Sequence, residues 1–183
     1  MIHRFSVVFR KMSFYFPPKK PSEELVKAEE KLKTKGYAFS SDKKMCQFDP
    51  ELGELIEDKG FAFEVKKGDQ SYNQKNYEDI GDIITEYTFG LLESDPMNLK
   101  RVPIPKHLSE SDSKSFVFVS EDFESNPNLC VIIHGSGVVR AGQWTRKLIM
   151  NNDLEAGTIM PDIMMAKKEG FAVLVTNTND NKR

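Results

Sequence analysis

The stretch that decides the fold runs from Leu129 to Gln143 and reads LCVIIHGSGVVRAGQ. Its first five residues, Leu129 to Ile133, are a short continuous apolar run, which is typical of a strand buried on both faces. The glycines of the next four residues, His134, Gly135, Ser136 and Gly137, allow a sharp turn that exposes backbone N–H groups. Such groups can stabilise an oxyanion or cradle a phosphate or carboxylate. The sequence therefore predicts a buried strand followed by an oxyanion-like or anion-binding loop.

The segments on both sides predict further strands and helices. Ser115 to Ser120 is rich in Phe and Val and reads as a strand. Residues 121–128 are too few for a parallel crossover, which takes about a dozen residues, so this strand and 129–133 should be antiparallel. We expect helices around Gln143 to Met150 and from Thr158 to Glu169, and then a parallel strand from Phe171 to Thr176.

Together these elements predict an α/β fold. An antiparallel strand followed by a strand-helix-strand unit resembles the opening of an α/β-hydrolase-like sheet, here incomplete and mostly parallel with one antiparallel strand. In such a sheet the strand at 171–176 lies between 115–120 and 129–133. Leu129 to Ile133 should then be a bare edge, and Val173 and Val175 should be more exposed than such residues tolerate.

A helical region with short strands precedes the sheet. Ser22 can cap a helix that stops at Gly36, and its thin apolar stripe suits loose surface docking or an interaction handle; we favour docking. Short strands are expected between residues 37 and 65, most clearly Phe61 to Val65. A second helix should start at Ser71 with a capping box and end at residues 94–96. Its apolar face comprises Tyr77, Ile80, Ile84, Tyr87 and Leu91, and a Pro-rich link follows at residues 102–105.

Composition limits the class of protein. The chain has 183 residues, which suits one domain with polar extensions, and its net charge of −2 gives no general attraction to nucleic acid. Two cysteines are too few for a disulfide framework, and no apolar run is long enough to span a bilayer. The basic residues before position 20 suit either a targeting sequence or a variable leader; we favour the leader because of its prolines.

The residues needed for catalysis are incomplete. No G-x-S-x-G elbow follows the loop, Ser136 lacks the flanking pattern of a nucleophile, and no acid and histidine follow it in order. His3 and His107 have no partners at metal-ligand spacing. We therefore expect a chain that is not an enzyme, with no catalytic residues, no metal site and no cofactor.

Two groups of residues have alternative readings. His134 could position a ligand, or it could pin its own loop by hydrogen bonds, which we favour. Arg140, Trp144 and Arg146, with Lys147, could form a partner surface that contacts RNA by charge and stacking. They could equally be a solvated helix face with one core tryptophan, and we favour this second reading.

Three segments resemble one family: HGSGVVRAGQW at 134–144, NNDLEAGTIMPDI at 151–163 and NQKNYEDIGDIITEY at 73–87. They are similar to the Argonaute-binding-protein-two-like family, described as cotranscriptional regulators with relatives in fungal RNA silencing. The resemblance implies a variable leader and surface helix at 1–36, and the N-terminal half of an Argonaute-binding-type α/β-hydrolase-like domain at 37–183. A truncated paralogue, a short isoform or a pseudogene product would match this pattern.

Three hypotheses about function remain. The resemblance implies a non-catalytic regulatory or interaction protein in small-RNA-linked heterochromatin or cotranscriptional splicing control. Its expected partners are Argonaute and chromatin or splicing factors, and its expected location is the nucleus, with the cytoplasm second; direct nucleic-acid binding and membrane association are not expected. The alternative, from the HGSG loop, is a hydrolase or esterase. The third hypothesis is a chain that does not fold and has no function.

Overall fold

The structure is a computed structural model that describes residues 20–104 and 115–180. The predictions for the leader up to residue 19, and those that concern His3, Pro105 and His107, lie outside the described residues. Within these two ranges, no helix is long and apolar enough to cross a membrane.

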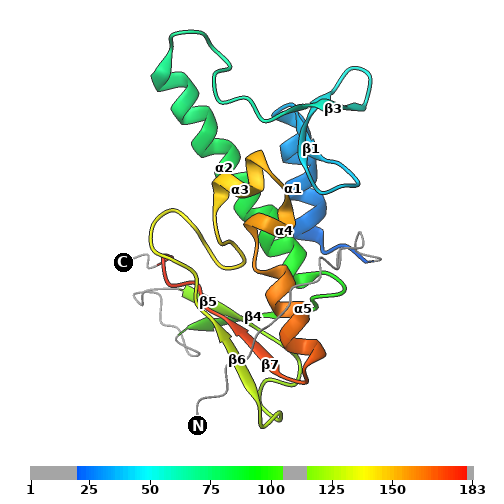
Figure 1. Cartoon of the computed structure of the whole chain (residues 1–183), viewed down its shortest axis with the longest axis vertical. Coiled ribbons are helices and arrows are strands. Elements are labelled where there is room, and N and C mark those ends of the chain that lie inside the picture. Colours follow the sequence, from blue (N-terminus) through cyan, green and yellow to red (C-terminus); the bar gives the residue numbers. More distant parts are fainter. Residues whose placement is uncertain (1–19, 105–114, 181–183) are drawn as a thin grey trace, which may run out of the picture.

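A four-stranded sheet forms one end of the molecule (Figure 1). Its strands are β4 (Lys100–Ile104), β5 (Ser115–Val119), β6 (Leu129–Ile132) and β7 (Ala172–Val175), in the order β4-β5-β7-β6. The predicted insertion of β7 between β5 and β6 is confirmed. The prediction of a mostly parallel sheet is wrong for the described strands, because β4–β5 and β5–β7 are antiparallel and β6–β7 is parallel. Part of the expected Pro-rich link forms β4, and Pro103 is tolerated there because β4 is an edge strand.

A smaller antiparallel sheet lies at the other end and contains β1 (Tyr37–Phe39), β2 (Met45–Asp49) and β3 (Glu54–Gly60). The predicted strand at Phe61 to Val65 is wrong, because pairing with β2 ends at Gly60. The Phe61 ring instead lies 5.6 Å from that of Tyr37 and 6.1 Å from that of Tyr77. The aromatic residues after Gly60 therefore pack against the start of the long helix rather than extend the sheet.

Two long helices, α1 (Glu23–Thr34) and α2 (Gln70–Glu93), pack side by side between the sheets. Ser22 caps α1 as predicted, accepting a hydrogen bond from the Leu25 N–H at 3.2 Å. The prediction of loose docking is wrong. A Cβ on Gly90 would lie 2.5 Å from the Leu25 backbone, so the two helices can approach this closely only because residue 90 is glycine. The cap of α2 is Asp69 rather than Ser71.

Three short helices, α3 (Arg146–Asn151), α4 (Leu154–Gly157) and α5 (Met160–Lys168), connect β6 to β7. Helix α5 packs against β7, beside the sheet in Figure 1, and the rings of Phe89 on α2 and Phe118 on β5 are 5.5 Å apart in the same core. Val173 and Val175 belong to this core and are buried, so their predicted exposure is wrong. The helices cover this face of the sheet. Its other face is partly open, because Leu129 and Val131 are exposed and β6 is not buried on both sides.

Candidate functional site

The glycine-rich loop leaves the carboxyl end of β6, beside the carboxyl end of its parallel neighbour β7. His134 follows β6, and Asn177 and Asn179 follow β7. The carboxyl ends of parallel strands are where α/β sheets generally place their ligands. We therefore take the segment from His134 to Arg146, which we call the motif segment, as the candidate site.

Two asparagines hold the loop in one conformation. The Asn179 amide donates to the carbonyls of Gly135 at 2.9 Å and Val139 at 3.0 Å, which are the two sides of the turn. The Asn177 side-chain oxygen accepts from the Ala141 N–H at 3.0 Å. These bonds fix the loop to the end of β7. Sequence reasoning missed both asparagines, because nothing in their local pattern distinguishes them from loop residues.

His134 is 5% exposed and lies at the start of the turn. Its Nδ1 is 2.9 Å from the Gly135 carbonyl oxygen, and the Asn179 amide nitrogen is 3.4 Å from the same ring nitrogen. The structure thus contains the loop-pinning contact that we favoured. The buried Nε2 has no hydrogen-bond partner in the described part of the chain. A ligand-positioning role for His134 remains a prediction.

The next three residues, Gly135 to Gly137, lie at the surface. Gly137 has φ +109°, a conformation that favours glycine, whereas Gly135 does not need positive φ. No hydrogen bond joins the Ser136 hydroxyl to His134 among the described contacts. A serine without an adjacent base is a weak nucleophile. Anion binding by the loop remains a prediction.

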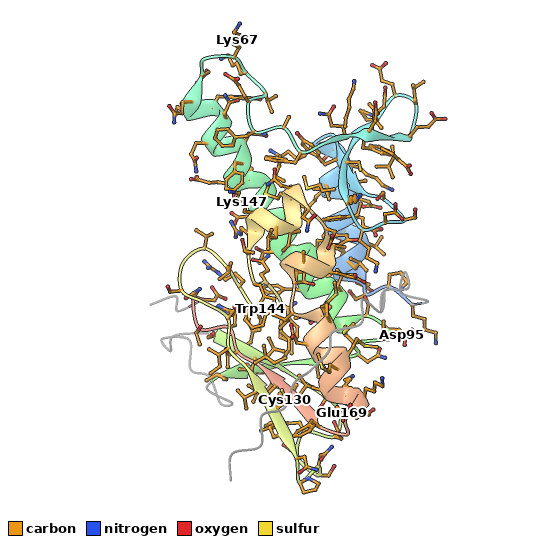
Figure 2. The ribbon with its side chains drawn as sticks, in the orientation of Figure 1. Lys67, Asp95, Cys130, Trp144, Lys147 and Glu169 are labelled. Atoms are coloured by element: carbon orange, nitrogen blue, oxygen red, sulfur yellow. The ribbon has the colours of Figure 1, made fainter. Side chains whose placement is uncertain are left out.

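The expected partner-surface residues have different environments and do not form one exposed surface. Arg140 donates to the carbonyls of its own turn, at Val138 and Val139, each at 3.1 Å. Trp144 lies outside the helices, is half-exposed, and donates from Nε1 to Asp162 at 2.9 Å (Figure 2). Arg146 is buried and lies on no surface. The favoured reading, a solvated helix face with a core tryptophan, is therefore wrong, although a smaller surface at Arg140 and Trp144 remains a prediction.

A buried polar network connects the motif segment to α2. Arg146 Nη2 donates to Thr85 at 3.0 Å and to Asp82 at 3.1 Å, and Gln143 Nε2 donates to Thr85 at 3.2 Å. A Cβ on Gly81 would lie 2.7 Å from Arg146 Nη1, so this glycine makes room for the guanidinium. Sequence reasoning missed the network. The available sign was a glycine and a threonine four residues apart beside the apolar face of a helix.

Backbone contacts bind the same segment to the following helices. The Trp144 and Thr145 N–H groups donate to the Gly157 carbonyl at 2.9 and 3.1 Å, and the Ile159 N–H donates to the Gly142 carbonyl at 3.0 Å. The motif segment thus packs against α2, α4 and the end of β7 at once. These hydrogen bonds hold the three elements together.

A second charged cluster lies where α1, α2 and β4 meet. Arg101 donates to Glu93 at 3.0 Å and to Glu24, while its guanidinium carbon lies 4.7 Å from the centroid of Phe116. Burial raises the pKa of Glu93, and Arg101 partly offsets this shift. The described residues include no group of three His, Cys, Asp or Glu side chains that could hold a metal ion.

The fold and the site define a mixed α/β protein whose glycine-rich loop is fixed by side chains from the neighbouring strand end. Residues 29–182 match the Arb2 domain family. The chain belongs to this family, which confirms the resemblance seen in its motifs. No solved structure matches the chain.

The chain is similar to several named relatives. The cotranscriptional regulator ARB2A of Mus musculus and that of Homo sapiens are each 53% identical over 122 residues. A FAM172 family protein homolog of Caenorhabditis elegans is 41% identical over 134 residues, covering 72% of this chain and 43% of the nematode protein. The mammalian alignments cover 66% of this chain but only 29% of the relatives. The chain therefore spans less than a third of the mammalian proteins.

Proposed function

We propose that this chain is a non-catalytic regulatory or interaction protein. The observation that carries the proposal is the use of the motif segment as a framework: Gln143 and Arg146 are buried against Thr85, and Asn179 closes the turn. Such a loop presents a fixed shape, and no hydrogen bond pairs Ser136 with a base in the described structure. The names of the relatives, cotranscriptional regulators, support the same role.

The finer proposal is a role in small-RNA-linked heterochromatin or cotranscriptional splicing control in the nucleus. Argonaute and chromatin or splicing factors are the proposed partners. Its support is the family membership together with the exposed Val138 and Trp144 around the fixed loop, which leave apolar surface available for a partner.

The test is recovery of partners with epitope-tagged chain expressed at its native level. We expect Argonaute or a chromatin or splicing factor to co-purify, and the tag to be nuclear. Gly90→Leu provides an unfolded control, because a side chain there would overlap the Leu25 backbone. If the wild-type chain recovers none of these partners and stays outside the nucleus, the proposal fails.

The sheet supports a proposal about ancestry as well. We propose that β5, β7 and β6 correspond to the opening strands of an α/β-hydrolase-like sheet, because β7 is inserted between the two earlier strands. Esterase activity is a separate question with a direct test. Purified protein should hydrolyse p-nitrophenyl acetate no faster than Ser136→Ala; a rate that falls with this substitution would favour a hydrolase.

A further inference from the structure

Strand β6 presents an unpaired edge in the described sheet. It is the last strand in the order β4-β5-β7-β6, and its alternate residues Leu129 and Val131, with Ile133 just beyond it, are 42%, 49% and 61% exposed. None of these three side chains is charged, and none is proline. An exposed apolar edge of this kind can accept a further strand.

The register identifies which backbone groups are free. The Ala172 N–H donates to the Asn128 carbonyl at 2.9 Å, and the Thr176 N–H donates to the Ile132 carbonyl at 3.1 Å. The even-numbered residues of β6 therefore face β7. Because alternate residues of a strand face opposite neighbours, the N–H and C=O groups of Leu129, Val131 and Ile133 point away from β7. They have no hydrogen-bond partner among the described residues.

An apolar groove of 420 Å³ accompanies this edge on the side covered by α5. Cys130 on β6 and Phe171, just before β7, line one side of it, and Met165 on α5 lines the other. Figure 2 labels Cys130 and Glu169, two of the residues that line this groove. Asp162 and Glu169 are the two acidic lining residues, and they lie toward opposite ends of α5. Neither carboxylate forms an ion pair with a described residue.

We propose that the β6 edge and its groove bind an extended segment of a partner protein by strand addition. The segment is apolar, with basic residues placed four apart. Asp162 and Glu169 are seven residues apart on a helix, which separates them by about 10 Å. Residues four apart on one face of a strand lie about 13 Å from each other. Lysines at two such strand positions can therefore reach the two carboxylates. This inference names a partner class for the interaction role proposed above and rests on that role.

A second copy of this chain fits the site less well. Its own β6 carries no basic residue, and pairing two edges would bring a second Asp162 and Glu169 to the same groove. Like charges at an interface oppose association. The two acidic residues that line the apolar groove therefore favour a basic partner segment over pairing with a second copy.

The test uses the capped peptide Ac-Thr-Lys-Val-Val-Val-Lys-Thr-NH2, titrated into isotope-labelled full chain and followed by NMR. We expect the peptide to bind and to slow exchange of the Val131 amide. A peptide with Glu in place of both lysines should bind at least tenfold more weakly. Val131→Pro, which removes an outward-facing N–H, and Val131→Lys should each weaken binding at least tenfold.

Leu148→Lys is the matched control, since Leu148 is 41% exposed on α3 and the substitution adds the same charge. It should leave binding unchanged. Equal affinity for both peptides, unaltered binding by the Val131 variants, or a stable dimer in sedimentation would each overturn the inference. If the peptide does not bind but the tagged chain still recovers Argonaute, only this binding site is rejected. If the peptide binds but the tagged chain recovers no nuclear partner, only the proposed function is rejected.

Discussion

The clearest residue-scale test compares two threonines on α2. Thr85 and Thr88 are both buried, and each hydroxyl donates to the carbonyl four residues earlier, but only Thr85 also accepts from Gln143 and Arg146. Thr85→Val removes the oxygen that accepts from both Gln143 and Arg146, although Arg146 keeps its hydrogen bond to Asp82. We expect it to lower the free energy of unfolding by about 1–3 kcal/mol more than Thr88→Val, measured by urea denaturation. Equal losses would mean that the network adds no net stability.

The glycines of the loop provide a second comparison. Gly137→Ala should lower the free energy of unfolding by about 1–3 kcal/mol, because a φ of +109° strains any residue that has a side chain. Space for the Cβ itself is available. Gly135→Ala meets no neighbour within 4 Å and needs no positive φ, so it should be neutral or stabilise by up to about 1 kcal/mol. Thermal melts of the two variants distinguish these cases. Equal stability of both would show that the turn relaxes at Gly137.

Two acidic residues, Glu93 and Asp122, should make opposite contributions to the pH dependence of folding stability. Burial raises the pKa of Glu93 above 4.5, so the folded state holds this proton more tightly than the unfolded chain. The resulting stabilisation is present below pH 4.5 and is lost as the pH rises through the folded pKa. Hydrogen bonds from Asn126 and Ser120 lower the pKa of Asp122 below 3.8, so its contribution is present above that pH and is lost on acidification.

The measurement is urea unfolding across this pH range for wild type, Glu93→Gln and Asp122→Asn. The stability advantage of wild type over Glu93→Gln should shrink as the pH rises past 4.5. Its advantage over Asp122→Asn should shrink as the pH falls below 3.8. Slopes of the same sign would contradict the assignment.

At the site, the sequence predicts the loop and leaves its supports unknown. The glycines and the apolar run before His134 identify the turn. Asn179 lies 44 residues beyond Gly135, and Thr85 lies 58 residues before Gln143, so these pairs meet only after the helices and sheet have packed. Arg146 is an example: a charged guanidinium predicts a surface position, and only the packed structure shows that Gly81 and Thr85 form a buried site for it.

At the scale of single elements, β6 should show an alternating pattern of amide exchange. The N–H groups of Cys130 and Ile132 face β7, and those of Leu129, Val131 and Ile133 face away. We expect slow exchange at the first two and exchange at least tenfold faster at the other three, measured by NMR on the free chain. Uniformly slow exchange over residues 129–133 would show that another segment covers this edge.

Helices and strands were predicted correctly where a local sequence pattern is compatible with only one kind of structure. The cap at Ser22 and the apolar spacing from Ile80 to Leu91 each place a helix correctly. The alternating aromatics at Phe61 to Val65 misled the prediction because their rings contact α2 rather than alternate across a strand. Strand β4 was not predicted because proline at position 103 argues against a strand. The structure places it on an edge strand, where proline is tolerated.

For the whole molecule, α2 connects the two sheets. Its buried residues Ile80 and Phe89 belong to one hydrophobic cluster with Met45 of the small sheet and Val173 of the large one. Lys43, beside the small sheet, also pairs with Glu155 on α4. A continuous core of this kind favours a single cooperative unfolding transition, so the two ends should not melt separately.

Trp144, the single tryptophan, reports on the end that holds the large sheet, because its indole is bonded to Asp162 on α5. Met45→Ala removes buried side-chain volume from β2 at the other end and should cost about 2–4 kcal/mol. If the core is continuous, the urea midpoint seen by Trp144 fluorescence should fall as far as the midpoint seen by far-ultraviolet circular dichroism. Val173→Ala, at the Trp144 end, should also move both midpoints together. A fluorescence midpoint that Met45→Ala leaves in place would show that the small sheet unfolds independently, and the absence of any transition in wild type would show that this chain does not fold alone.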